Sequence, residues 1–256
     1  MIPDRFMSIL WFVHRGFLFL RIFNPMRNIP GNILFIMLSL ITFTGCRSDK
    51  NAANTTTADV ISYKVNYLEE MAGDIPTKML PDVMEAYYTR RYIKTSIKGF
   101  FGQFSLVQVA DLRRNKVITM LNFFGNKAYY VGERGEIPAG IVPLRDPEVN
   151  FTNDTLTICG MLSRRAEVTT TGSTYDIYYT ETIDIKSPNI TTPYYFIDYV
   201  LSDFRVQLSV LKMHLVMKKH VEKEVDISDF QVPEDYDPVS RQTMESLINS
   251  LFTKEE

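Results

Sequence analysis

Apolar and polar side chains alternate along several segments of this sequence, and the alternation restricts the fold more than any other feature. It runs from Ile61 to Tyr67 and again, over eleven residues, from Tyr175 to Ile185. Successive side chains of a β-strand point to opposite faces, so a period of two is typical of strands that bury one face. We therefore expect an α+β fold that is mainly β and is built on an antiparallel sheet.

A meander of adjacent strands is expected where turn-forming residues separate apolar runs, over residues 104–109, 117–124 and 128–131. The middle strand is apolar on both faces: one carries Val117, Leu121 and Phe123, and the other carries Ile118, Met120 and Phe124. Antiparallel sheets usually expose one face to water. Both faces of this strand are therefore covered, or one of them lines a cavity, for which Val117, Leu121 and Phe123 are the candidate lining.

Other segments add curvature and a helix. The alternation changes phase between Val210 and Leu211, which indicates a bulge or a tight turn. Residues 84–92 suit a helix or an edge strand, and we favour the strand. The Pro-rich segment 138–147 is either a lid over a cavity or a surface crossover between two halves of the sheet. A closing amphipathic helix is expected to begin at Asp237-Pro238 and to dock on the sheet through Met244, Leu247, Ile248, Leu251 and Phe252.

The composition and the motif search exclude several functions. The 28 Lys and Arg residues are balanced by 30 Asp and Glu residues, so nucleic acid is not expected as a partner. The sequence holds no catalytic motif and no Cys/His spacing suited to a metal, and we expect no enzyme activity, no metal and no cofactor. His214 and His220 are interpreted as solvated surface histidines. The oligomeric state stays open.

The N-terminal region has the features of an export signal. Residues 32–45 form an uncharged apolar run of about 14 residues, shorter than the roughly 17–25 residues that span a bilayer. Arg27 precedes the run, and Phe43-Thr44-Gly45-Cys46 closes it and resembles the lipobox of bacterial lipoproteins. This resemblance implies cleavage before Cys46, a thioether link from Cys46 to diacylglycerol, and acylation of the new amino terminus. The alternative is an uncleaved anchor helix that ends in an ordinary cysteine.

These features divide the chain into three parts. Residues 1–45 are expected to be a cleaved signal region whose true start is Met26. Residues 46–59 are polar and rich in Thr and Asn, which is typical of a flexible tether. Residues 60–256 are expected to form a single domain. The acyl chains would hold this domain on a membrane without any segment crossing it.

The domain also resembles a known family. An acylated tether precedes a long run of antiparallel strands, a Thr157-Ile158-Cys159-Gly160 segment and a closing Phe230-to-Tyr236 segment. This order resembles the uncharacterised envelope lipoproteins related to the lipoprotein-carrier (LolA/LolB-like) fold. The resemblance implies a curved, incomplete barrel plugged or flanked by helices, a cavity that takes up acyl chains, and a place on the outer membrane of a Gram-negative bacterium, at its periplasmic face or the cell surface. With Cys46 acylated, Cys159 has no intrachain partner and is expected to be buried and inert.

Two functions remain open from the sequence. The first is a membrane-anchored module without enzyme activity that binds a lipid or an acylated protein in an apolar cavity. The alternative is an outer-membrane scaffold whose interior is fully packed and whose surface or sheet edge is presented to a protein partner.

Overall fold

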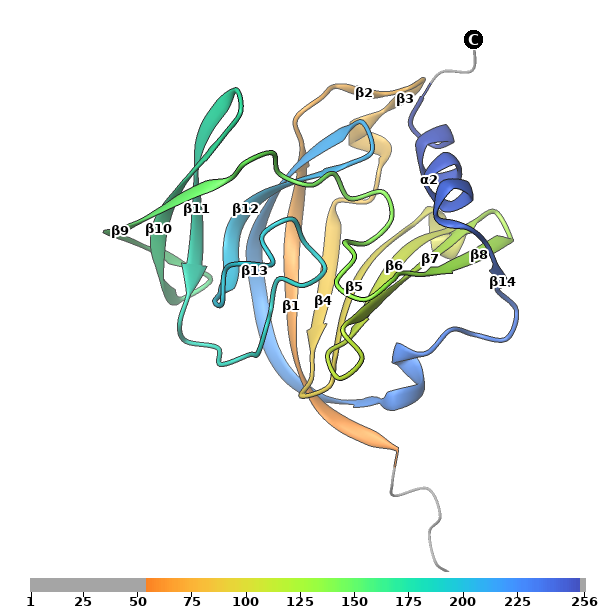
Figure 1. Ribbon diagram of the computed structural model, residues 1–256, viewed down its shortest axis with the longest axis horizontal. Coiled ribbons are helices and arrows are strands. Elements are labelled where there is room, and N and C mark those ends of the chain that lie inside the picture. The colour runs from red at the N-terminus through yellow and green to blue at the C-terminus, as the bar shows by residue number, and fades with distance from the viewer. Residues whose placement is uncertain (1–53, 254–256) are drawn as a thin grey trace, which may run out of the picture. The chain divides into compact units, whose positions relative to one another are not determined.

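One large sheet dominates the fold. The computed structural model describes residues 54–253, and these contain a sheet of 12 strands in the order β14-β8-β7-β6-β5-β4-β1-β13-β12-β11-β10-β9, with a separate two-stranded sheet β2-β3 (Figure 1). The elements are β1 (Thr55–Tyr67), β2 (Met71–Ala72), β3 (Ile75–Pro76), β4 (Val83–Tyr88), β5 (Tyr92–Gly99), β6 (Phe104–Asp111), β7 (Lys116–Phe123), β8 (Asn126–Val131), β9 (Glu148–Ile158), β10 (Met161–Thr170), β11 (Ser173–Thr180), β12 (Val200–Leu208), β13 (Leu211–Asp226), β14 (Asp237–Pro238), the helix α2 (Arg241–Ser250) and the 3-10 helices η2 (Thr77–Met79), η3 (Phe100–Gly102) and η4 (Ile227–Phe230).

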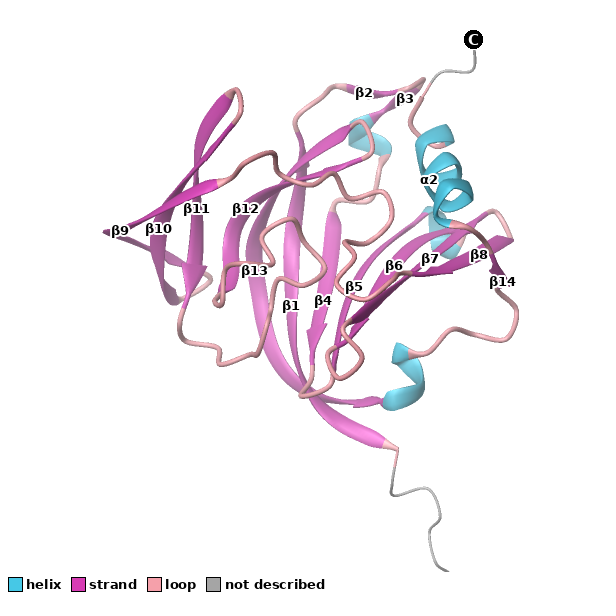
Figure 2. Cartoon of the chain, viewed as in Figure 1, coloured by secondary structure: helices cyan, strands magenta, loops and turns pink. Residues whose placement is uncertain are grey.

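The large sheet consists of two meanders joined by its first strand. Strands β4 to β8 pair in chain order, and so do β9 to β13. Between the meanders, β1 pairs with β4 on one side and with β13 on the other, both antiparallel. The register shifts within β1–β13, β9–β10 and β11–β12 mark irregularities that bend the sheet. The result is a curved sheet that does not close into a barrel, flanked by one α-helix near the C-terminus (Figure 2). The α+β, mainly β fold class is therefore confirmed.

The sheet is covered on both faces around β7, as the sequence predicted. Val117 and Leu121 lie in the main core, which also holds Met244 and Ile248 of α2. On the opposite face, Met120 belongs to a second apolar cluster. This second cluster is closed by Phe230 and by the segment that follows it. β7 is thus apolar on both faces because the main core covers one face and the second apolar cluster covers the other.

Several predicted elements are confirmed. Residues 84–88 of the ambiguous segment lie in β4, which is a strand as favoured but an interior one between β1 and β5 and not an edge strand, and the meander appears as β6, β7 and β8. The phase change at Val210 is a tight turn between β12 and β13, in which Ser209 has a φ of 53°. Because this turn reverses the chain, the apolar residues fall at even-numbered positions before it and at odd-numbered positions after it.

The Pro-rich segment is a crossover that pairs with the end of β12, and its Ile141 lines a small cavity of about 30 Å³. The amide of Val142 donates to the carbonyl of Gln207 at 3.0 Å, and the amide of Ser209 donates to the carbonyl of Gly140 at 2.8 Å. Ile141 also forms a β-bridge with Leu208. The segment therefore continues the edge of β12 at the level where β11 no longer pairs with it.

Three expected boundaries and one pairing direction are wrong. The first strand begins at Thr55, so residues 55–59 of the expected tether pair with β13. The strand expected to reach Ile185 ends at Thr180. The helix begins after Ser240, because Asp237-Pro238 forms β14, which pairs in parallel with β8. This pair makes the sheet mixed at its β8 edge, where a purely antiparallel sheet was expected.

The expectations for the N-terminal region lie outside the described residues. They concern the signal region 1–45 with its start at Met26, the acylated Cys46 and most of the tether. Among residues 54–253, no helix has the length and apolar character needed to cross a membrane.

Candidate functional site: an apolar groove beside helix α2

An open groove of about 760 Å³ lies between α2, the β7–β8 edge of the sheet and the β2–β3 sheet. Its wall is apolar where the helix faces the strands, and polar residues stand at its rim. The apolar lining is Ala72, Ile75, Leu121, Phe123, Ala128, Val239, Leu247 and Leu251. The polar lining is Asp74, Asn126, Lys127, Asp237, Ser250 and Thr253. The site thus has an apolar floor with polar residues at its rim.

A small apolar cavity of about 30 Å³ adjoins the groove. Ile75, Phe123 and Leu251 line both spaces. Phe252, which is buried, lines the cavity but not the groove. The side chains at the end of α2 therefore form part of the wall between the groove and this cavity.

The structure brings two of the three predicted lining residues to this site. Leu121 and Phe123 line the groove. Val117 does not; it is as buried in the main core as Leu121, but it lies four residues earlier on β7, outside the groove lining. The prediction therefore placed the lining strand correctly and erred at its first residue.

Sequence reasoning missed the other walls of the groove. Leu247 and Leu251 belong to the apolar stripe that was expected to dock on the sheet, and Leu247 remains 38% exposed. Ala72 and Ile75 come from two-residue strands that carry no periodic signal. A fully docked helix would bury its whole stripe, so the exposed Leu247 is the sign that the stripe is only partly covered.

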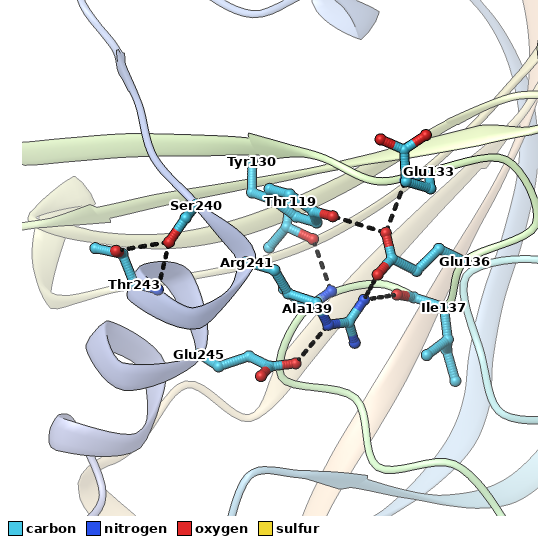
Figure 3. Close-up of polar contacts among 10 residues, drawn as sticks. All are labelled: Thr119, Tyr130, Glu133, Glu136, Ile137, Ala139, Ser240, Arg241, Thr243 and Glu245. Carbon is cyan, nitrogen blue, oxygen red and sulfur yellow. Dashed lines mark hydrogen bonds and ion pairs between the residues drawn. The ribbon is translucent and has the colours of Figure 1, made fainter.

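The start of α2 is fixed by a polar network around Arg241 (Figure 3). Its Nη1 lies 2.6 Å from Oε1 of Glu136 and donates to the carbonyl of Ile137 at 3.1 Å. Its Nε donates to Oε1 of Glu245 at 2.8 Å. Ser240 caps the helix by accepting from the amide of Thr243 at 3.1 Å. The contacts with Glu136 and Ile137 attach the first turn of the helix to the residues just before the crossover segment.

Glu136 is the centre of this network. Its Oε2 accepts from the hydroxyl of Tyr130 and from the amide of Glu133, each at 2.7 Å. Partial burial raises the pKa of Glu136, but these hydrogen bonds and the Arg241 guanidinium outweigh burial and hold the pKa below its ordinary range. The carboxylate is therefore charged at neutral pH and keeps Arg241 in place.

The crossover segment is in turn packed tightly between α2 and the sheet. The amide of Ala139 donates to Oγ1 of the buried Thr119 at 3.1 Å. Gly140 has a φ of 83°, and a Cβ at this position would lie 2.8 Å from Cδ1 of Ile248. The crossover segment thus approaches α2 closely at Ile248, in the second half of the helix. At its other end, the hydroxyl of Ser250 donates to Leu247 and that of Thr253 donates to Asn249, within the same helical segment.

The two histidines are not freely solvated, contrary to expectation. Nε2 of His214 lies 2.6 Å from Oδ1 of Asp203, and Nε2 of His220 lies 2.8 Å from Oδ1 of Asp59. Each pair joins neighbouring strands, which explains why the sequence spacing did not show it. No cluster of three or more potential metal ligands occurs among residues 54–253.

Cys159 is exposed, and the expectation of a buried thiol is wrong. It lies with Gly160 in the turn between β9 and β10, and both residues have positive φ angles, 52° and 75°. A two-residue turn of this kind places its side chains at the tip of a hairpin. The thiol therefore points away from any core.

Comparison with known proteins identifies no family. No protein-family model matches the chain, and no curated protein matches it. Among solved structures, PNGF-II in the C2 space group aligns with a TM-score of 0.48 at 13% identity, over 75% of this chain and 32% of that chain. PNGF-II in the P21 space group aligns with a TM-score of 0.45 at 13% identity, over 77% of this chain and 33% of that chain. The chain thus spans about a third of the length of these structures.

Proposed function

We propose that this protein is a membrane-anchored envelope lipoprotein, without enzyme activity, that binds the acyl chain of a lipid or of an acylated protein in the groove beside α2. The observation that supports this function is the apolar groove of about 760 Å³ that shares a wall with an apolar cavity. Sites for small apolar ligands usually measure about 300–1,000 Å³ and carry few polar groups. The groove has that size, and eight of its fourteen lining residues are apolar.

The polar rim favours an amphiphile over a purely apolar ligand. Lys127 and Asp237 stand at the rim, and the Lys127 side chain pairs with Asp235. An acyl chain can lie along the apolar floor of the groove while its polar end stays at this rim. The polar groups of the ligand then remain hydrated, so no desolvation cost opposes binding.

The proposed anchor holds the domain near a bilayer. Acylated Cys46 would be followed by a short tether that ends where β1 begins at Thr55. An extended chain spans at most ~3.5 Å per residue, so this tether reaches about 30 Å. The domain would stay within that distance of the outer membrane of a Gram-negative bacterium, the location that the lipobox resemblance implies.

A matched pair of helix variants tests ligand binding. Ser250 lines the groove and is exposed, so Ser250→Trp fills the groove without disturbing the core. Ser246 is equally exposed on α2 but does not line the groove, and Ser246→Trp is the control. The full-length protein is purified in detergent, incubated with fatty acid or phospholipid, and analysed by native mass spectrometry before and after solvent extraction.

We expect wild type and Ser246→Trp to carry an extractable lipid and Ser250→Trp to lose most of it. If wild type shows no lipid beyond its covalent anchor, acyl-chain binding is not the function. Equal loading of the two tryptophan variants would place the lipid outside the groove.

One observation favours the scaffold alternative. Strand β9 ends the sheet with a free edge, and its side chains Phe151 and Leu156 are 52% and 49% exposed. A free edge can pair with a strand of another protein. A photo-crosslinking residue at Leu156 would then capture one defined partner in cells, and the same residue at Lys186 would not. A protein that carries no lipid and captures such a partner would be a scaffold.

A further inference from the structure

A second, polar pocket lies on the face of the sheet that is opposite the main core. It measures about 270 Å³ and is formed by β4, β5, β6 and β7 beneath the segment that runs from η4 to β14. Its lining is Tyr87, Lys94, Ser96, Lys98, Ser105, Val107, Met120, Ser228, Asp229, Gln231, Pro233 and Tyr236. The pocket is separate from the groove beside α2, because the two share no lining residue.

Alternation along β5 places three polar residues toward this pocket. Ile93 and Ile97 belong to the main core, so Lys94, Ser96 and Lys98 point to the opposite face. On the next two strands, Val107 of β6 and Met120 of β7, both of the second apolar cluster, lie in the same cross-strand row as Ser96. The pocket therefore has an apolar floor and a line of three donor groups along β5.

Both lysines lack a carboxylate partner. Within the described part of the chain, neither Lys94 nor Lys98 forms an ion pair. Nζ of Lys94 donates to the carbonyl of Asp229 at 3.3 Å and lies 4.3 Å from the Tyr87 ring centroid and 5.0 Å from that of Phe230. These contacts hold the ammonium group but do not neutralise it.

The surroundings of Lys94 favour an added negative charge. Burial lowers the pKa of Lys94, and although Asp229 and Glu85 oppose this, Lys98 and Lys223 lower the pKa further. Nζ of Lys223 also lies over the Tyr87 ring, 4.9 Å from its centroid. Of the two acidic residues, Glu85 already accepts a hydrogen bond from the Tyr87 hydroxyl at 2.9 Å. Lys94 and Lys98 thus line this half-buried space together with Asp229, and Lys223, which does not line it, adds positive charge nearby.

Ser96 is the second, independent observation. Its side chain stands between the two lysines on β5 and is only 5% exposed. Its Oγ has no hydrogen-bond partner among the described residues. A buried hydroxyl without a partner is costly, so most such groups bind a ligand, an ion or water. Ser105, which pairs with Lys98 across β5 and β6, adds a second hydroxyl.

We propose that this pocket binds a phosphate group, with Lys94 and Lys98 supplying charge and Ser96 donating a hydrogen bond. A tetrahedral oxyanion accepts several hydrogen bonds at once and would give Lys94 and Lys98, which form no ion pair within the described residues, a direct counter-charge. The phosphate belongs to a phospholipid headgroup or to a soluble phosphate monoester. This site is independent of the acyl-chain groove, and its test does not depend on the function proposed above.

Isothermal titration of the full-length protein in a non-ionic detergent with inorganic phosphate tests the site. We expect one saturable site whose affinity falls as salt increases. Lys98→Met should weaken binding by about tenfold and Ser96→Ala by several fold, because each removes one charge-assisted contact. The exposed Lys186 lies in the loop after β11, away from the pocket, and Lys186→Met should bind phosphate like wild type.

Lys94→Met is not the decisive variant, because Lys94 also contacts Phe230 and Asp229 of the covering segment and its loss can unfold that segment. Lys98 and Ser96 make no such contact, so their variants report on binding alone. Absence of saturable binding in wild type, or equal affinity in wild type and Lys98→Met, would overturn the proposal.

The source of the phosphate follows from two further titrations. Dihexanoyl phosphatidylglycerol is soluble and carries the headgroup on a lipid, while glycerol 3-phosphate carries the phosphate alone. Tighter binding of the lipid would assign the site to a headgroup. Equal or tighter binding of glycerol 3-phosphate would assign it to a soluble phosphate monoester.

Discussion

Arg241, the first residue of α2, and Glu136, which lies just before the crossover segment, form an ion pair of 2.6 Å. The pair joins two parts of the chain that are more than 100 residues apart, and both side chains are about three quarters covered. Because Glu136 also accepts hydrogen bonds from Tyr130 and Glu133, the helix is linked through one carboxylate to β8. This carboxylate therefore controls how firmly one wall of the groove is held.

Arg241→Met should lower the free energy of unfolding by about 1–3 kcal/mol, the range for loss of charge-assisted hydrogen bonds at a partly covered site. Urea unfolding followed by circular dichroism measures the change. In a double-mutant cycle, Arg241 should couple more strongly to Glu136 than to Glu245, because the latter pair is an i,i+4 pair on the helix surface. Equal coupling energies would show that the network does not act through Glu136.

The stability that Glu136 contributes should depend on pH. Its pKa is lower in the folded protein than the ordinary value of 4.5, because the Tyr130, Glu133 and Arg241 contacts outweigh burial. A lowered folded pKa gives stability that is complete above the unfolded value and is lost as pH falls through the folded value. The difference in unfolding free energy between wild type and Glu136→Gln should therefore be largest at neutral pH and shrink below about pH 4.5. Urea titrations at pH 7, 5, 4 and 3 measure it, and a constant difference would contradict this account.

Gly140→Ala should destabilise the protein by about 2–4 kcal/mol, through left-handed backbone strain and a clash with Ile248. Gly125→Ala provides the comparison, since Gly125 has a similar φ of 88° but no atom within 4 Å of a Cβ there. That variant should lose only about 1–2 kcal/mol from strain. Thermal unfolding compares the two. If both variants lose the same stability, the crossover segment is not packed tightly against α2.

The exposed thiol of Cys159 should react with a maleimide in the native state as fast as in urea. The full sequence contains 2 cysteines, so the number that reacts also tests the proposed anchor. A lipidated Cys46 would leave one reactive thiol per chain, and Cys159→Ser would leave none. Two labelled thiols in wild type, counted by mass spectrometry, would show that Cys46 is not acylated.

Strand positions could be predicted where one chain segment carries its own periodic signal. The alternation around Tyr63 identified β1, the turn residues on either side of the apolar run around Met120 identified β7, and the phase change at Val210 identified the turn that follows β12. The helix was also predicted, but its start was not. Asp237 and Ser240 are both good capping residues, and only the pairing of Asp237 with β8 decides between them.

The groove was only half predictable for a related reason. Leu121 and Phe123 were identified because they share one face of one strand. Ile75 and Leu247 come from distant segments, and their meeting depends on how α2 settles on the sheet. The His214–Asp203 contact and the exposure of Cys159 likewise depend on neighbours across strands or on turn geometry. Such features arise from tertiary packing, which no local pattern records.

The pairing of β1 with β13 determines the order in which this protein can fold. Residues 55–67 find their partners at residues 211–226, so the central pair of the sheet forms only after nearly the whole chain is present. The β4–β8 meander can assemble earlier from contacts between neighbouring strands. Until β13 arrives, one edge of β1 stays unpaired and can join the strand of another molecule. A chain that is synthesised from its N-terminus therefore completes its sheet late and requires protection from aggregation in the interval.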